Sequence, residues 1–97
     1  MTIEIKRSTD TTRILLSGRL DTTTAPALEK TLREDVGEAA QLVLDLKELE
    51  YISSAGLRVL LAAQKRLGDS MKLTHVGEMV MEVFEMTGFA DILNIEA

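Results

Sequence analysis

The most restrictive feature of this sequence is a short apolar run near its middle, from Gln41 to Leu46, interrupted only by Asp45. Apolar runs of this length are typical of interior strands that are covered on both faces of a sheet. The run therefore predicts an α/β fold with this segment at the centre of the sheet. We expect Asp45 just before the carboxyl end of the strand, where its carboxylate reaches a loop N–H or the N-terminus of the next helix.

The N-terminal residues have the pattern of a β-hairpin. Ile3 and Ile5 alternate with polar residues, which is the period-two signature of a half-buried strand. The polar stretch Ser8–Thr12 predicts a turn, and a second strand follows over Arg13–Ser17, closed by Gly18. The first two strands are therefore expected to be antiparallel neighbours.

A first amphipathic helix is expected to begin within Asp21–Ala25, where several side chains are suitable N-caps. Pro26 fits the first helical turn because its missing N–H is not needed there, and Gly37 is a suitable terminator. The inward positions are Leu28, Leu32 and Val36, and the outward ones are Glu29, Lys30, Arg33 and Glu34.

A second helix is predicted from about Ser54 to Leu67, before Gly68. Its inward face consists of Gly56, Leu60, Ala63 and Leu67, with Leu57 beside it. A second stripe at i, i+4, i+7 and i+11 is formed by Ser54, Arg58, Leu61 and Lys65. This second stripe is expected to face solvent and to be available to a partner.

The last third of the chain predicts a strand over Met71–Val76 and a helix that opens at Gly77 and stops at Gly88. The inward positions of this helix are Val80, Val83 and Phe84, and a final short strand or helical turn contains Ile92, Leu93 and Ile95. Helical spacing favours partial core packing for four of the methionines, Met71, Met79, Met81 and Met86. A solvated acidic stripe is expected from Glu78, Glu82 and Glu85.

The order β-β-α-β-α-β-α predicts a mixed sheet of four to five strands, in which an antiparallel hairpin is joined to parallel β-α-β units with right-handed crossovers. Helices are expected mainly on one face, and residues 1–97 are expected to form a single domain. The chain contains no repeat or linker that would divide it.

Composition excludes several classes of function. A net charge of -5 repels a phosphate backbone, and aromatic residues make up only 3% of the chain, so we expect no direct contact with nucleic acid. With no cysteine and one histidine, His75, which we expect alone at a sheet margin, the sequence predicts no metal site, no cofactor and no enzyme activity. Met1–Arg7 lacks the apolar core of a signal peptide, so a cytoplasmic protein without direct membrane contact is expected.

The junction between the central strand and the second helix places two serines at a helix N-terminus. Ser53 or Ser54 is an N-cap in the simplest interpretation, which stabilises a helix by about 1 kcal/mol. Asp21 is a candidate cap for the first helix.

The whole segment from Leu44 to Leu61, LDLKELEYISSAGLRVLL, resembles the signature of the STAS family, whose small members are bacterial anti-sigma factor antagonists. The resemblance rests on three groups of residues in the family's order and spacing. Around the second helix these are Leu42–Leu46, Tyr51, Ile52, Ser54, Gly56, Leu57, Val59 and Leu60. Before the first helix they are Gly18, Leu20, Asp21, Thr24 and Ala25, and near the end of the chain Phe84, Thr87, Gly88 and Phe89.

The resemblance implies a phosphorylation-switched binding module. The family's phosphorylated serine matches Ser54, and the unphosphorylated form captures a partner that is both anti-sigma factor and serine kinase of the GHKL type. Phosphorylation releases that partner and a serine phosphatase resets the protein, which is expected to be a monomer when free. The partner-binding surface implied is Asp21, Thr24, Ser53, Ala55, Gly56, Arg58, Leu61 and Lys65.

Two departures from the family pattern leave alternatives open. Ser53 and Ala55 stand where many members have an acidic residue and a hydroxyl, so phosphorylation at Ser53 remains an alternative. Arg58 stands where several members have a smaller residue, so the resemblance implies that either the partner's surface or the kinase differs from the best-known systems. The alternative function is an accessory subunit of a lipid transporter or a component of a stressosome-like scaffold.

Overall fold

The computed structural model describes residues 1–34 and 41–96. Its strands are β1 (Thr2–Arg7), β2 (Thr11–Leu20), β3 (Gln41–Ile52) and β4 (Met71–Thr74), and its helices are α1 (Ala25–Glu34), α2 (Ser54–Leu67) and α3 (Glu78–Thr87). Two short 3-10 turns are η1 (Gly68–Ser70) and η2 (Phe89–Asp91). The sheet order is β1-β2-β3-β4. β1 pairs antiparallel with β2, and the other two pairs are parallel, which confirms the predicted mixed α/β sheet.

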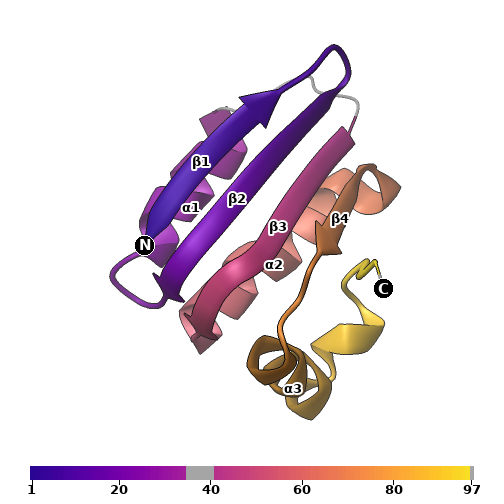
Figure 1. Cartoon of the computed structure of the whole chain (residues 1–97). Coiled ribbons are helices and arrows are strands. Elements are labelled where there is room, and N and C mark those ends of the chain that lie inside the picture. Colours follow the sequence, from indigo (N-terminus) through magenta and orange to yellow (C-terminus); the bar gives the residue numbers. More distant parts are fainter. Residues whose placement is uncertain (35–40, 97) are drawn as a thin grey trace.

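Helices α1 and α2 cover the same face of the sheet, whereas α3 lies beyond the end of β4 (Figure 1). The covered face is apolar because alternate strand residues point toward the two helices, as Ile14 and Leu16 do in β2 and Leu42 and Leu44 do in β3. Leu28 of α1 and Leu60 of α2 are fully buried in the same cluster, as predicted. The core therefore lies between the sheet and α1 and α2.

The central strand is twice as long as the sequence analysis predicted. β3 continues from Leu46 to Ile52, and its register against β2 shifts twice, between the pairs Leu15↔Asp45 and Ser17↔Glu48 and between Gly18↔Leu49 and Arg19↔Tyr51. Each shift adds one residue to β3, which is the definition of a β-bulge. Buried positions in this half of β3 are Leu46, Leu49 and Ile52, so they recur every third residue. The bulges therefore conceal the period-two pattern from which a strand is predicted.

The predicted ends of β2 and β4 were also wrong. Gly18 does not close β2 but takes a positive φ of 87° at the second register shift, and the strand continues to Leu20. β4 ends at Thr74, two residues before the predicted end, because His75 adopts a left-handed φ of 53°. Left-handed backbone cannot continue a strand ladder.

Asp45 and His75 form a pair that the sequence analysis did not predict. Asp45 lies within β3 and not near its carboxyl end, and its Oδ1 accepts a hydrogen bond from the backbone N–H of Lys47 at 3.0 Å. The same oxygen lies 3.1 Å from Nδ1 of His75, and Oδ2 lies 3.8 Å from Nη1 of Arg13. His75 is therefore not alone, and Asp45 supports a bulge rather than the next helix.

The second and third helices match their predicted ranges. α2 buries Gly56, Leu57, Leu60 and Ala63, with Leu67 partly buried. α3 buries Val80 and Phe84, with Val83 partly buried.

The prediction of core packing for four methionines was right for two of them. Met71 is buried and Met81 is partly buried against the core. Met79 and Met86 are 72% and 86% exposed, so the core prediction was wrong for these two. The predicted inward Val36 and terminator Gly37 of α1 lie outside the described residues.

The end of the chain adds a short contact to the free edge of β4. Ile95 forms a single parallel bridge with Leu73, in place of the optional fifth strand. Gln64 of α2 is 7% exposed and anchors this segment, because its Oε1 accepts from the backbone N–H of Asn94 at 3.0 Å. Its Nε2 donates to the carbonyls of Gly68 and Met71 at 2.8 and 3.1 Å, so both N–H donors and the oxygen of the buried amide are hydrogen-bonded.

Candidate functional site

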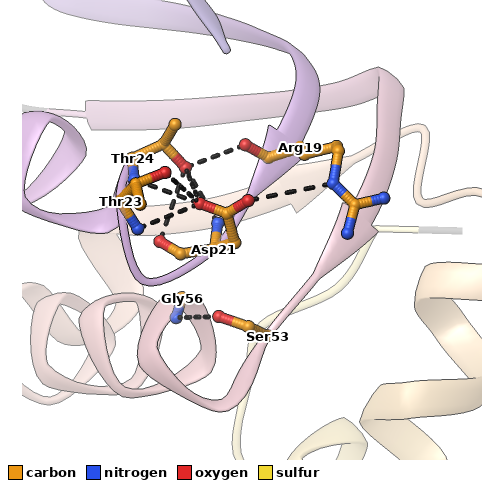
Figure 2. A network of polar contacts seen from close by, with 6 residues as sticks. All are labelled: Arg19, Asp21, Thr23, Thr24, Ser53 and Gly56. Atoms are coloured by element: carbon orange, nitrogen blue, oxygen red, sulfur yellow. Dashed lines mark hydrogen bonds and ion pairs between the residues drawn. The ribbon is translucent and has the colours of Figure 1, made fainter.

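The candidate site lies where β2 and β3 end side by side. Leu20 and Ile52 are paired across the two parallel strands, and the backbone N–H of Ser53 donates to the carbonyl of Leu20 at 2.8 Å. Parallel strands deliver both of their following segments to the same edge of the sheet. The turn after β2 and the first residues of α2 therefore come together, as Figure 2 shows.

Asp21 organises the turn after β2. Its Oδ1 accepts from the backbone N–H groups of Thr23 and Thr24 at 3.0 and 3.2 Å and from the Thr23 hydroxyl at 2.8 Å (Figure 2). The hydrogen bond from the Thr23 hydroxyl is the largest of the effects that hold the pKa of Asp21 below its usual value, and the two backbone N–H groups act in the same direction. The carboxylate is thus ionised and engaged within its own turn.

Asp21 was predicted as a candidate cap of α1, and its side chain instead caps the turn that precedes this helix. Its side chain accepts from residues that precede α1, so it closes the turn that leads into the helix, while its main-chain carbonyl accepts from Ala25 at 2.7 Å. Thr24 Oγ1 locks the same turn, because it accepts from the Asp21 N–H at 2.8 Å and donates to the Arg19 carbonyl at 2.8 Å. The predicted site residues Asp21 and Thr24 are therefore both half-buried parts of a rigid turn.

The two serines have different structural roles at the start of α2. Ser53 is the N-cap: its backbone is extended and its Oγ accepts from the Gly56 N–H at 3.4 Å. Ser54 is the first residue of the helix and is exposed. Its hydroxyl makes no hydrogen bond within the described part of the chain. Ser53 is therefore the cap of the two candidates, and replacing Ser54 removes no cap.

Gly56 belongs to the support beneath the site and not to its surface. A Cβ at this position would lie 2.6 Å from Cγ of Leu20 and 3.0 Å from Cγ1 of Ile52. Both neighbours are buried, so only glycine lets the first turn of α2 approach the ends of β2 and β3 this closely. Of the eight residues implied as a partner surface, Gly56 is the one that is sealed from solvent.

The remaining predicted residues form the solvent-facing stripe that was expected along α2. Arg58 and Lys65 are exposed, and Ala55 and Leu61 are half-buried. Arg58 has no ionic partner among residues 1–34 and 41–96. A groove between α1 and α2 runs beside this stripe and is lined by Thr22, Ala25, Pro26, Glu29, Ala55, Arg58, Val59 and Ala62. The structure thus brings the predicted residues together along one side of α2.

Arg19 and Tyr51 are neighbours of the site that are not among the predicted site residues. The Arg19 guanidinium carbon lies 4.2 Å from the centre of the Tyr51 ring, and Arg19 Nε lies 3.8 Å from Asp21 Oδ2. Tyr51 is 41% exposed, so the pair presents an aromatic and cationic edge next to the Asp21 turn. Their pairing depends on the second bulge of β3, and no spacing rule in the sequence reveals it.

The described residues contain neither a metal site nor a membrane-spanning helix. No group of three or more acidic, histidine or cysteine side chains in this part of the chain is arranged to hold a metal ion. Among the same residues, no helix is both long and apolar enough to cross a membrane.

Comparisons with known proteins agree with this fold. Residues 3–94 match the family model described as "Mlab, STAS domain". The chain is 36% identical over 101 residues to an anti-sigma-B factor antagonist of Listeria monocytogenes, covering 99% of this chain and 89% of the relative. It is 30% identical over 98 residues to the anti-sigma-B factor antagonist of Bacillus subtilis, covering 98% of this chain and 90% of the relative. These relatives are named for a regulatory binding role, in agreement with the prediction that the chain is not an enzyme.

Solved structures show the same architecture. An anti-sigma factor antagonist from Mycobacterium paratuberculosis superposes with a TM-score of 0.86 at 27% identity, covering 97% of this chain and 83% of that chain. The phosphorylated form of the Bacillus protein SpoIIAA has a TM-score of 0.73 at 17% identity, covering 99% of this chain and 92% of that chain, and supports the fold alone. On the family match, the relatives and the fold together, the chain belongs to the STAS domain family.

Proposed function

We propose that this chain is an anti-sigma factor antagonist whose binding surface is the start of α2 and the Asp21 turn, and that phosphorylation of Ser54 switches binding off. The single observation that carries the proposal is the division between the two serines. Ser53 caps the helix, while the Ser54 hydroxyl is exposed and unused in the described structure. A kinase can therefore modify Ser54 without removing any interaction that holds the fold.

The electrostatics of the helix start suit such a switch. A phosphate adds about -1.5 to -2 charges and three acceptor oxygens. At the first residue of α2 it meets free backbone N–H groups and the positive end of the helix dipole, and Arg58 lies four residues on, on the same side. The phosphorylated domain therefore remains folded, whereas a partner that covers Ser54 has to desolvate the phosphate and loses affinity.

The partner in this proposal is an anti-sigma factor that is also a serine kinase of the GHKL type, with a serine phosphatase as the resetting enzyme. The names of the relatives support the anti-sigma factor, because they describe antagonists of such factors. Arg58 is exposed and has no ionic partner among the described residues, which supports a partner surface that carries an acidic side chain opposite it. We propose that the whole chain acts as one cytoplasmic, monomeric domain.

Affinity purification from the source organism tests this function. Wild-type chain and Ser54→Ala are expected to retain a soluble kinase, and Ser54→Asp is expected to lose it, because its charge lies in the contact. Ser8→Asp is the matched control, since Ser8 is exposed in the turn between β1 and β2, at the opposite end of the sheet (Figure 1). Recovery of a membrane ATPase or of a large multi-subunit assembly, in place of a kinase, would contradict the proposal and support the transporter or scaffold alternative.

A further inference from the structure

Helix α3 exposes two apolar side chains, Met79 and Met86, that do not contribute to its packing against the core. We call this pair the apolar strip. Val80 and Phe84 are the residues that fix the helix to the core, being 2% and 0% exposed. Met79 and Met86 are seven residues apart, which places them on the same side of a helix, and they are 72% and 86% exposed. Removing either thioether from the helix therefore costs the core nothing.

The strip is bordered by negatively charged side chains. The three glutamates Glu78, Glu82 and Glu85 are exposed on the same outer half of α3. Glu82 lies between the two methionines along the helix axis. From Val76 to Ile95 the sequence contains no lysine or arginine. None of these three carboxylates has an ionic partner in the described structure, whereas Glu4, Asp21 and Glu29 all do.

The apolar strip continues past the start of the helix. Met79 lines a shallow groove together with Leu49, Glu50, Gly77, Glu78 and Val80, so the second half of β3 forms its other wall. Glu50 is exposed and adds a fourth acidic side chain beside Met79. We define the α3 surface as Glu50, Glu78, Met79, Glu82, Glu85 and Met86.

We propose that the α3 surface docks a basic amphipathic helix of a partner protein. Methionine side chains are flexible and polarisable, so they adapt to the apolar face of an incoming helix. The surrounding carboxylates select lysine and arginine on the flanks of that helix, and they repel both nucleic acid and anionic lipid. Ser54 lies on α2 and is not part of the α3 surface, so we expect the contact to be independent of the phosphorylation switch.

A peptide titration followed by NMR of methyl-labelled methionines tests this proposal on the full chain. The probe is a helix of about 18 residues, or five turns, built from Leu and Lys with one apolar face. Its control replaces every Lys with Glu. We expect the basic peptide to shift the Met79 and Met86 methyl signals and to leave that of the buried Met71 unchanged. The acidic peptide is expected to shift none of them.

Two variants separate a specific contact from general attraction to an acidic protein. Met79→Ser/Met86→Ser, which keeps the net charge, is expected to weaken binding at least about tenfold. Glu82→Lys/Glu85→Lys is expected to weaken it similarly, while the charge-matched control Glu34→Lys/Asp69→Lys has a much smaller effect because both of its sites are exposed and lie outside the α3 surface.

The proposal fails if the Met79 and Met86 signals do not move at about 1 mM basic peptide, the limit of weak binding. It also fails if the two charge-reversed variants lose affinity equally, or if the serine variant binds as tightly as the wild type. A result in which Ser54→Asp binds the peptide normally supports a site independent of the switch.

Discussion

The substitution Gly56→Ala is the clearest test of how closely α2 packs against the ends of β2 and β3. The added methyl would lie 2.6 Å from Leu20 Cγ and 3.0 Å from Ile52 Cγ1, and both of these side chains are buried. Overpacking of this kind costs about 1 to 3 kcal/mol. Alanine recovers less than about 1 kcal/mol through helix propensity. We therefore expect a net loss of about 1 to 2 kcal/mol, which lowers the Tm by about 4 to 16 °C in a domain of this size.

Thermal and urea denaturation measure this loss, and a double-mutant cycle assigns its cause. Leu20→Ala alone is expected to cost about 2 to 5 kcal/mol. It also removes the Cγ atom that the new methyl meets, so the Gly56→Ala/Leu20→Ala protein should lose clearly less than the sum of the single changes. Gly77→Ala is the matched control, because a Cβ there meets no atom within 4 Å. Unchanged stability of Gly56→Ala, or strict additivity with Leu20→Ala, would refute the steric argument.

Ser53→Ala should lower the free energy of unfolding by about 1 kcal/mol in urea titrations through loss of the cap, and Ser54→Ala by less than about 0.5 kcal/mol; equal losses would contradict the assignment of Ser53 as N-cap. Asp21 has a pKa below its ordinary value of 3.8 in the folded state, so its contribution is present above that pH and is lost as the pH falls through the lowered value. The Tm difference between wild type and Asp21→Asn should accordingly be largest at pH 7 and shrink on acidification, and a difference that does not change with pH would argue against this role. Arg58→Glu should weaken partner binding in calorimetry much more than it changes the Tm, since surface changes usually stay within about 0.5 kcal/mol; unchanged affinity would remove Arg58 from the interface.

The helices were predictable because their signals are local. The caps and apolar spacing of α2 and α3 lie within the segments themselves, and the structure has Ser54–Leu67 and Glu78–Thr87 where these signals place them. The strands were less predictable because each bulge in β3 depends on its partner β2. A pattern read along one strand contains no information about that register.

Contacts between distant residues account for the rest of what was missed. Asp45 and His75 are 30 residues apart, and they meet only because β3 and β4 are neighbours. The exposure of Met79 and Met86 was missed for a different reason, because helical spacing does not say which of several apolar residues reaches the core. At the site itself, the spacing placed Ser53 and Ser54 at a helix start, but only the structure distinguishes the cap from the exposed hydroxyl.

The central claim is that Ser54 is the switch, and phosphosite mapping tests it most directly. Wild type, Ser54→Ala and Ser53→Ala are incubated with ATP and the purified kinase from the source organism, and the phosphate is located by mass spectrometry. We expect one phosphate on Ser54 in the wild type and in Ser53→Ala, none in Ser54→Ala, and loss of kinase binding in the phosphorylated protein. Phosphate on Ser53, undiminished labelling of Ser54→Ala, or no labelling of the wild type would contradict the account.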